Sequence, residues 1–276
     1  INKQFSLDSL LISSKAIKIN DLVLLSRSIN NTPELFLLNN IIKDGFLIAD
    51  INLNFDSTGK IKKDYQIKGF IKKGKLDILN KYSIKDLNFI FNIKDKQYNL
   101  RDIGGNFNQI GLIFPSIKIK KKDNQFLING KLINKAKDIN IKLLNNFLRN
   151  GFKNNKIEEI NFSSDSDFTF TINKNFKISN FDLKSIINLN KLVYKNNLPS
   201  LKKYLPSLKE LIKLEKHKIF INYQKEQLNV EGKGRITIED YTDKINYKIT
   251  KKQNDYFFDK NINIDNNPLL IDILEY

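Results

Sequence analysis

The residues of this chain that could perform catalysis are few, and their spacing does not bring them together. His217 is the only histidine, and it follows Glu215 in a segment that we expect to end a helix. A histidine at that place more often interacts with the helix dipole than acts as a base. Glu158 and Glu159 are adjacent, so in a strand their carboxylates point to opposite faces and cannot flank one substrate. The sequence therefore predicts a protein that is not an enzyme.

Metal and cofactor sites are not predicted either. The chain has no cysteine, which excludes thiolate-bound zinc, iron–sulfur clusters and disulfides. The run from Ser163 to Asp167 has two carboxylates two positions apart but lacks the glycine and the distal glutamate of a calcium loop. Gly232-Lys233-Gly234 fits neither a phosphate-binding loop nor a dinucleotide fingerprint. We expect no cofactor and no metal.

The charge of the chain is strongly positive, with a formal net charge of +17 over 276 residues. Such a balance is typical of proteins that bind nucleic acid, but the cations are almost all lysines, spread along the chain, with arginine only at Arg27, Arg101, Arg149 and Arg235. Recognition of phosphate and guanine favours arginine, because its planar guanidinium binds with two hydrogen bonds. We therefore expect no nucleic-acid partner, and interpret most lysines as the water-facing side of strands. A weaker attraction to anionic membrane lipids remains.

The dominant pattern of the sequence is an alternation of apolar and polar residues, which is typical of strands with one apolar face. The run from Phe46 to Phe55 is the clearest example, and no run of 18 apolar residues that could cross a membrane interrupts the pattern. Short polar segments such as Lys94-Asp95-Lys96 and Gln224-Lys225-Glu226 join successive runs and predict hairpins with three-residue turns. Serial hairpins make an antiparallel meander. About 16 to 18 strands at ~4.8 Å spacing would form a ribbon of ~80 Å if they were continuous.

A few short amphipathic helices should interrupt the strands. We expect one over residues 21–29 capped by Asn20, one over residues 34–43 that begins with Pro33, one over residues 138–149, and one near residues 198–216. The polar stretch from Arg149 to Glu158 suggests a division into residues 1–150, with the N-terminal helices and a first β segment, and residues 151–276. The second part, with the helix near 198–216, would continue the same sheet.

Several segments together resemble a known family. They are the stretch from Phe5 to Leu22, the strand from Phe46 to Phe55, the glycine-centred strand Tyr65 to Ile71 (Y-Q-I-K-G-F-I) and the hairpin from Leu87 to Ile103. The stretch from Asp243 to Tyr276 is also similar. The chain resembles the AsmA-like superfamily of diderm bacteria, which includes the TamB-like proteins, and would be a fragment of a larger member.

The resemblance implies a fold, a place and a function. The expected fold is mainly β, a long twisted antiparallel meander curled into a taco-like groove. The expected place is the periplasm, with an anchor in the inner membrane supplied by a segment outside this chain. Members of the superfamily are thought to move phospholipid along the groove toward the outer membrane, and TamB-like members are tied to the assembly of outer-membrane proteins.

The alternation supplies the residues that would line such a groove, because each strand must hide its apolar face under helices, against a second sheet, or around acyl chains. We call these residues the lining set. They are Leu47, Ile51, Leu53, Ile67, Phe89, Phe91, Phe126, Ile128, Phe168, Phe170, Ile219, Ile221, Val230, Ile245 and Tyr247. Singly, each residue fits ordinary core packing better than a groove, and only the set supports a groove for phospholipid.

Two partner classes therefore follow from the sequence. The first is phospholipid, together with the inner and outer membranes or their proteins. The alternative is a structural or assembly factor for outer-membrane proteins, whose exposed sheet edges pair with strands of a client. The sequence does not decide between an open groove and a closed sandwich of two sheets, or give the oligomeric state.

Overall fold

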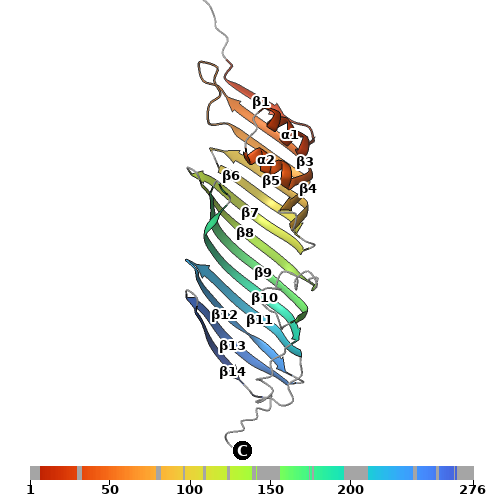
Figure 1. Ribbon diagram of the computed structural model, residues 1–276, viewed down its shortest axis with the longest axis vertical. Helices are drawn as coiled ribbons and strands as arrows, with labels where there is room; N and C mark the ends of the chain where they lie inside the picture. Colours follow the sequence, from red (N-terminus) through yellow and green to blue (C-terminus); the bar gives the residue numbers. More distant parts are fainter. Residues whose placement is uncertain are drawn as a thin grey trace, which may run out of the picture. The chain divides into compact units, whose positions relative to one another are not determined.

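The computed structural model describes residues 7–29, 33–78, 82–95, 97–107, 110–122, 125–138, 141, 156–173, 175, 177–195, 211–238, 241–252, 255–263 and 265. These residues form two compact units. Unit 1 comprises residues Ile1–Lys131 and Thr169–Ser179, and unit 2 comprises Leu132–Phe168 and Asn180–Tyr276. Almost every described residue outside two helices lies in an antiparallel strand (Figure 1).

Unit 1 begins with two short strands and two helices and continues as a meander. Its elements are β1 (Ser9–Ser13), β2 (Ile17–Lys18), α1 (Ile19–Ile29), α2 (Pro33–Ile41), β3 (Ile42–Asn54), β4 (Gln66–Ile78), β5 (Tyr82–Lys94), β6 (Gln97–Phe107) and β7 (Ile110–Lys122). The strand order is β1-β3-β4-β5-β6-β7, and β2 pairs with β3 beside β1. The helices pack on one end of the sheet, α1 against β3 and α2 against β3 and β4 (Figure 1).

Unit 2 is likewise a meander of antiparallel strands. The strands β8 (Gln125–Asp138), β9 (Lys156–Asn173) and β10 (Ile178–Lys195) contribute residues to both units. They are followed in unit 2 by β11 (Leu211–Gln224), β12 (Gln227–Ile238), β13 (Tyr241–Lys252) and β14 (Asp255–Asn263). Neighbours in the sheet are again neighbours in the chain, in the order β10-β11-β12-β13-β14.

The predicted fold class, a mainly β antiparallel meander with a few short helices, is confirmed. The described part of the chain has 14 strands, fewer than the number expected from sequence, because most of them run for 11 to 18 residues. The turns are also tighter than expected. Gln224 pairs with Gln227, which leaves a two-residue turn in which Lys225 and Glu226 have φ angles of 50° and 62°. Positive φ at both positions defines the type I′ turn, whose twist matches that of the strands it joins.

The helices differ from the expectations in two places, at Asn20 and at residues 211–216. Asn20 does not cap α1, which begins at Ile19; its Nδ2 instead donates to the Lys43 carbonyl at 3.0 Å. The helix expected over residues 138–149 falls almost wholly outside the described residues, as does the part of the 198–216 helix up to residue 210. For residues 211–216 the helix prediction is wrong, because they form the start of β11, where Leu214 pairs with Leu192 and Ile236.

A row of irregularities bends the strands of unit 1. Lys73 in β4, Asp86 in β5 and Asp102 in β6 all have positive φ, and the register between these strands shifts beside each of them. Asn88 links two of these positions, because its Oδ1 accepts from the Lys73 N–H at 3.0 Å and its Nδ2 donates to the Asp86 carbonyl at 2.6 Å. Such bulges bend a strand and increase its twist, so they curve the sheet of unit 1.

Candidate functional site

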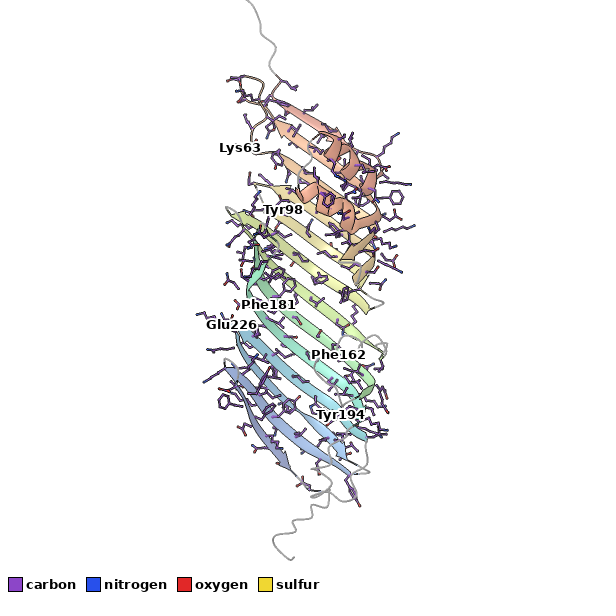
Figure 2. The ribbon with its side chains drawn as sticks, viewed as in Figure 1. Lys63, Tyr98, Phe162, Phe181, Tyr194 and Glu226 are labelled. Carbon is purple, nitrogen blue, oxygen red and sulfur yellow. The ribbon has the colours of Figure 1, made fainter. Side chains whose placement is uncertain are left out.

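Apolar side chains form continuous rows across the strands of unit 1. Directly paired residues of neighbouring strands share one face of the sheet. Three rows follow from the register. They are Ile12-Ile51-Ile67-Ile93-Tyr98-Ile119, then Ala49-Gly69-Phe91-Leu100-Ile117, and then Ile17-Leu47-Ile71-Phe89. Leu53 pairs with Leu10 beside the first row. These residues make up the apolar face of unit 1, and Tyr98 marks its place on β6 (Figure 2).

A glycine makes room for the aromatic ring at the centre of this face. A Cβ on Gly69 would overlap the Ile48 carbonyl oxygen and lie 2.8 Å from Cζ of Phe91 and 2.9 Å from Cα of Ala49. Phe91 thus lies over the backbone of its neighbouring strand, and Phe89 meets it edge-on with ring centroids 6.4 Å apart. The ring and the glycine together give a flat apolar surface.

The lining set is neither sealed nor fully exposed. Phe91 is buried, with 7% of its surface exposed, and the other fourteen residues are half-buried. Residues of a closed core between two sheets lose almost all of their surface. The apolar face is therefore partly accessible in the described part of the chain. Much of its burial comes from side chains of the same row packing against one another, and not from a second layer.

Unit 2 brings together five further members of the lining set. Ile221 pairs with Val230, and Ile219 pairs with Gly232, which pairs with Tyr247. Ile245 lies opposite Gly234. Together with their partners these residues form the apolar face of unit 2. A Cβ on Gly232 would overlap the Tyr247 ring, so a strand glycine again lies beneath an aromatic ring.

The remaining four members lie on β8 and β9. Phe126, Ile128 and Phe170 belong to unit 1, and Phe168 belongs to unit 2. The Thr169 hydroxyl donates to Asn129 Oδ1 at 2.9 Å, which places these two side chains on one face. By alternation Ile128 and Phe170 lie on the opposite face within unit 1.

His217 is a buried residue of strand β11 and not, as expected, the end of a helix. Only 2% of its surface is exposed. Its Nε2 is 2.9 Å from the Arg235 carbonyl oxygen and must donate to it, so Nδ1 carries the lone pair of the neutral ring. Nδ1 is buried without a hydrogen-bond partner. Burial lowers the pKa of His217, although the bond to Arg235 opposes this shift, so the ring is neutral at pH 7.

Two of the other polar segments noted in the sequence have polar partners within the sheet. Glu159 accepts from Lys191 in an ion pair of 2.7 Å. Ser166, in the run from Ser163 to Asp167, hydrogen-bonds to Ser185 with their hydroxyls 2.7 Å apart. The described residues contain no group of three or more carboxylates and histidines that could hold a metal, and no helix among them is long and apolar enough to cross a membrane.

The lining set omitted residues that the register adds to the apolar face. β1, β6 and β7 contribute Leu10, Ile12, Tyr98, Leu100, Ile117 and Ile119. The sequence pattern could have identified these residues, because the two on each strand are two positions apart, as the alternation requires.

Comparison of the chain with models of protein families, with curated proteins and with solved structures finds no match.

Proposed function

We propose that the chain binds the acyl chains of phospholipids on its apolar faces and transfers phospholipid between the inner and outer membranes, as a periplasmic segment of the AsmA-like type. The proposal rests on the in-register apolar face of unit 1. The members of the lining set on this face are half-buried, apart from Phe91, which is buried. A face of this kind binds hydrocarbon without directional contacts, which suits cargo that must slide.

The free energy expected from burying an acyl chain on this face is of the size needed for reversible binding. Each methylene removed from water contributes up to about 0.8 kcal/mol, so ten methylenes give at most about 8 kcal/mol, the scale of a micromolar dissociation constant. Costs of ordering the lipid reduce this value. The interaction would thus hold an acyl chain long enough to move it and still release it at a membrane.

A second function is favoured by the outer edge of β14. Tyr256, Phe257 and Phe258 are 54%, 57% and 69% exposed there, and among the described residues β14 pairs with β13 alone. An exposed apolar edge strand is a template for a further strand. An assembly factor for outer-membrane proteins would use this edge, and photo-crosslinking from position 257 to a client strand in the absence of bound lipid would favour this alternative.

Two adjacent residues of β5 allow a sharp test of lipid transfer. Phe89 is half-buried on the apolar face, whereas Ile90, 42% exposed, lies on the opposite face. We expect purified chain to carry phospholipid detectable by mass spectrometry, and Phe89→Asp to abolish transfer between vesicles while Ile90→Asp retains it. Absence of extractable lipid, or equal loss in both folded variants, would refute the proposal.

A further inference from the structure

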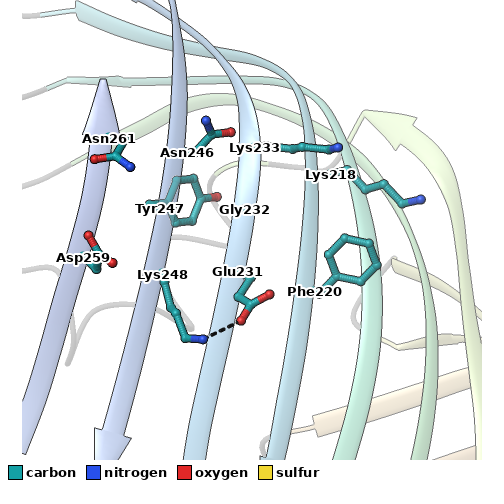
Figure 3. A pocket seen from close by; sticks show the side chains of 10 residues that line it. All are labelled: Lys218, Phe220, Glu231, Gly232, Lys233, Asn246, Tyr247, Lys248, Asp259 and Asn261. Carbon is teal, nitrogen blue, oxygen red and sulfur yellow. Dashed lines mark ion pairs between the residues drawn. The ribbon is translucent and has the colours of Figure 1, made fainter. Parts of the chain in front are cut away.

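A pocket of about 350 Å³ lies on the other side of the unit 2 sheet, across β11, β12, β13 and β14 (Figure 3). Two rows of directly paired residues supply most of its lining. The first row is Lys218-Lys233-Asn246-Asn261, and the second is Phe220-Glu231-Lys248-Asp259. Gly232 and Tyr247 lie between the rows, and their side-chain positions belong to the apolar face, so these eight residues lie on the opposite face.

The second row is balanced in charge. Lys248 donates to Glu231 Oε1 at 2.8 Å, and Asp259 is its direct partner on β14. The hydrogen bond to Glu231 and, more weakly, the charge of Asp259 raise the pKa of Lys248. Phe220 ends this row as an exposed aromatic side chain, 41% exposed, with the Lys218 ammonium 5.2 Å from its ring centroid.

The first row is not balanced. Lys218 and Lys233 lie directly opposite each other, and neither makes an ion pair in the described part of the chain. The next pair along the same face, Arg235 and Lys244, differs, because Arg235 also lies directly opposite Glu215 of β11. Like charges directly opposite one another destabilise a sheet. In unit 1, by contrast, Lys68 lies directly opposite the carboxylate of Asp50.

We propose that Lys218, Lys233 and Asn246 bind the phosphate group of a ligand whose body rests on Phe220. Two ammonium groups and an amide supply donors, and a bound anion would remove the repulsion between the two lysines. The pocket is larger than a phosphate ion, which leaves space for an attached glycerol or sugar. This site lies on the face opposite to the apolar face, so it does not depend on the proposed lipid transfer.

The test is calorimetric titration of the chain with inorganic phosphate, with glycerol 3-phosphate, and with vesicles of phosphatidylglycerol or phosphatidylcholine. Binding of the soluble phosphates identifies a small-molecule ligand, and binding of phosphatidylglycerol vesicles alone identifies a lipid headgroup; either result supports the site. We expect Lys233→Gln and Lys218→Gln each to weaken binding at least tenfold. Lys68→Gln is the matched control, because it removes the same charge from a lysine opposite a carboxylate, and it should leave binding unchanged.

If binding is too weak for calorimetry, urea unfolding with and without phosphate is the second test. Relief of the repulsion should make Lys233→Gln unfold at a higher urea concentration than the unmodified chain in buffer without phosphate, and added phosphate should stabilise the unmodified chain more than the variant. No binding of inorganic phosphate, of glycerol 3-phosphate or of phosphatidylglycerol vesicles, or equal losses in Lys233→Gln and Lys68→Gln, would overturn the site. Phe89→Asp should retain phosphate binding, so failure of lipid transfer and failure of this site are separate results.

Discussion

The apolar faces of the two units are built on the same strand pattern but differ in what is buried in them. In unit 1 the rows contain aliphatic and aromatic side chains, and the buried hydrophobic residues of the unit are Ala49, Phe91 and Ile103 of the strands and Ile19 and Val23 of α1. Unit 2 also buries hydrophobic residues, namely Leu189, Val193, Ile212 and Ile236. All four buried polar side chains of the described residues, Ser166, Ser185, His217 and Asp243, belong to unit 2. Alternation alone thus produces an apolar face, while the residues within it decide whether the face also offers hydrogen bonds.

The two faces share one packing device. Gly69 in unit 1 lies beneath Phe91, and in unit 2 Gly232 lies beneath Tyr247 and Gly234 beneath His217. In each case a ring from the neighbouring strand occupies the place of the missing Cβ. The His217 and Tyr247 rings are 5.9 Å apart, so unit 2 presents a pair of rings where unit 1 presents Phe89 and Phe91.

The largest effect is expected for the buried ring of unit 1. Phe91→Ala should lower the free energy of unfolding by about 3 to 5 kcal/mol, because it removes a ring that is packed on Gly69 and leaves a void. Urea unfolding followed by circular dichroism measures the change. Phe258→Ala, at an edge position 69% exposed, is the control and should change stability by less than about 1 kcal/mol. Equal effects would show that Phe91 is not part of a packed face.

The next effect tests the glycine beneath the ring. Gly69→Ala should cost about 1 to 3 kcal/mol, since its Cβ would meet backbone atoms of Ile48 and Ala49 that cannot move aside. Gly104→Ala is a matched control, because a Cβ there meets nothing within 4 Å, and it should be tolerated. A destabilised Gly104→Ala with a neutral Gly69→Ala would contradict the packing described above.

The units should also respond to different ranges of pH. Burial holds the pKa of His217 below its ordinary value near 6.5, so the unfolded state binds the proton more tightly. Stability of unit 2 is therefore complete above about pH 6.5 and falls as the pH drops below it. In unit 1, hydrogen bonds from the Thr58 hydroxyl and from the Lys60 and Thr58 amides lower the pKa of Asp56, so its contribution is lost only below about pH 3.8.

Urea titrations at pH 7.5, 5.5 and 4.5 measure this difference. His217→Gln should remove most of the change between pH 7.5 and 5.5, and Asp56→Asn should not. A pH dependence that survives in His217→Gln would place its origin elsewhere.

The smallest effect is expected at the surface of unit 2. Lys191→Gln breaks the ion pair with Glu159, whose side chains are 39% and 47% exposed. Solvent screening limits such pairs to less than about 1 kcal/mol, and the loss should vanish in 1 M salt. A loss of stability larger than this and insensitive to salt would show that the ion pair is not screened by solvent.

The strands and the composition of the apolar face could be predicted from the sequence because both depend on a local two-residue period. The pairings of Ile51 with Ile67 and of Ile67 with Ile93 follow once the hairpins are placed. The helix near residues 198–216 shows the limit of this approach. Ile212 satisfies both a helical stripe with Leu205 and Leu208 and a strand alternation with Leu214, and the choice is made by pairing with β10 and β12.

Features that depend on contacts between strands could not be predicted from the sequence. The bulges at Lys73, Asp86 and Asp102 could not be located from residue type, because Asp tolerates positive φ but also occurs throughout the regular strands. The Lys73 bulge depends on the hydrogen bond from its N–H to Asn88 of the neighbouring strand, which only the paired strands provide. The burial of His217 over Gly234 likewise requires the register of β11 and β12.

The accessible apolar face is tested most directly by fluorescence, because the chain contains no tryptophan. Phe89→Trp and Ile90→Trp place single reporters on opposite faces of β5, and phospholipid with brominated acyl chains quenches only a tryptophan that it touches. We expect strong quenching of Phe89→Trp and little of Ile90→Trp. Equal quenching of both, or of neither, would contradict the binding of acyl chains to the apolar face.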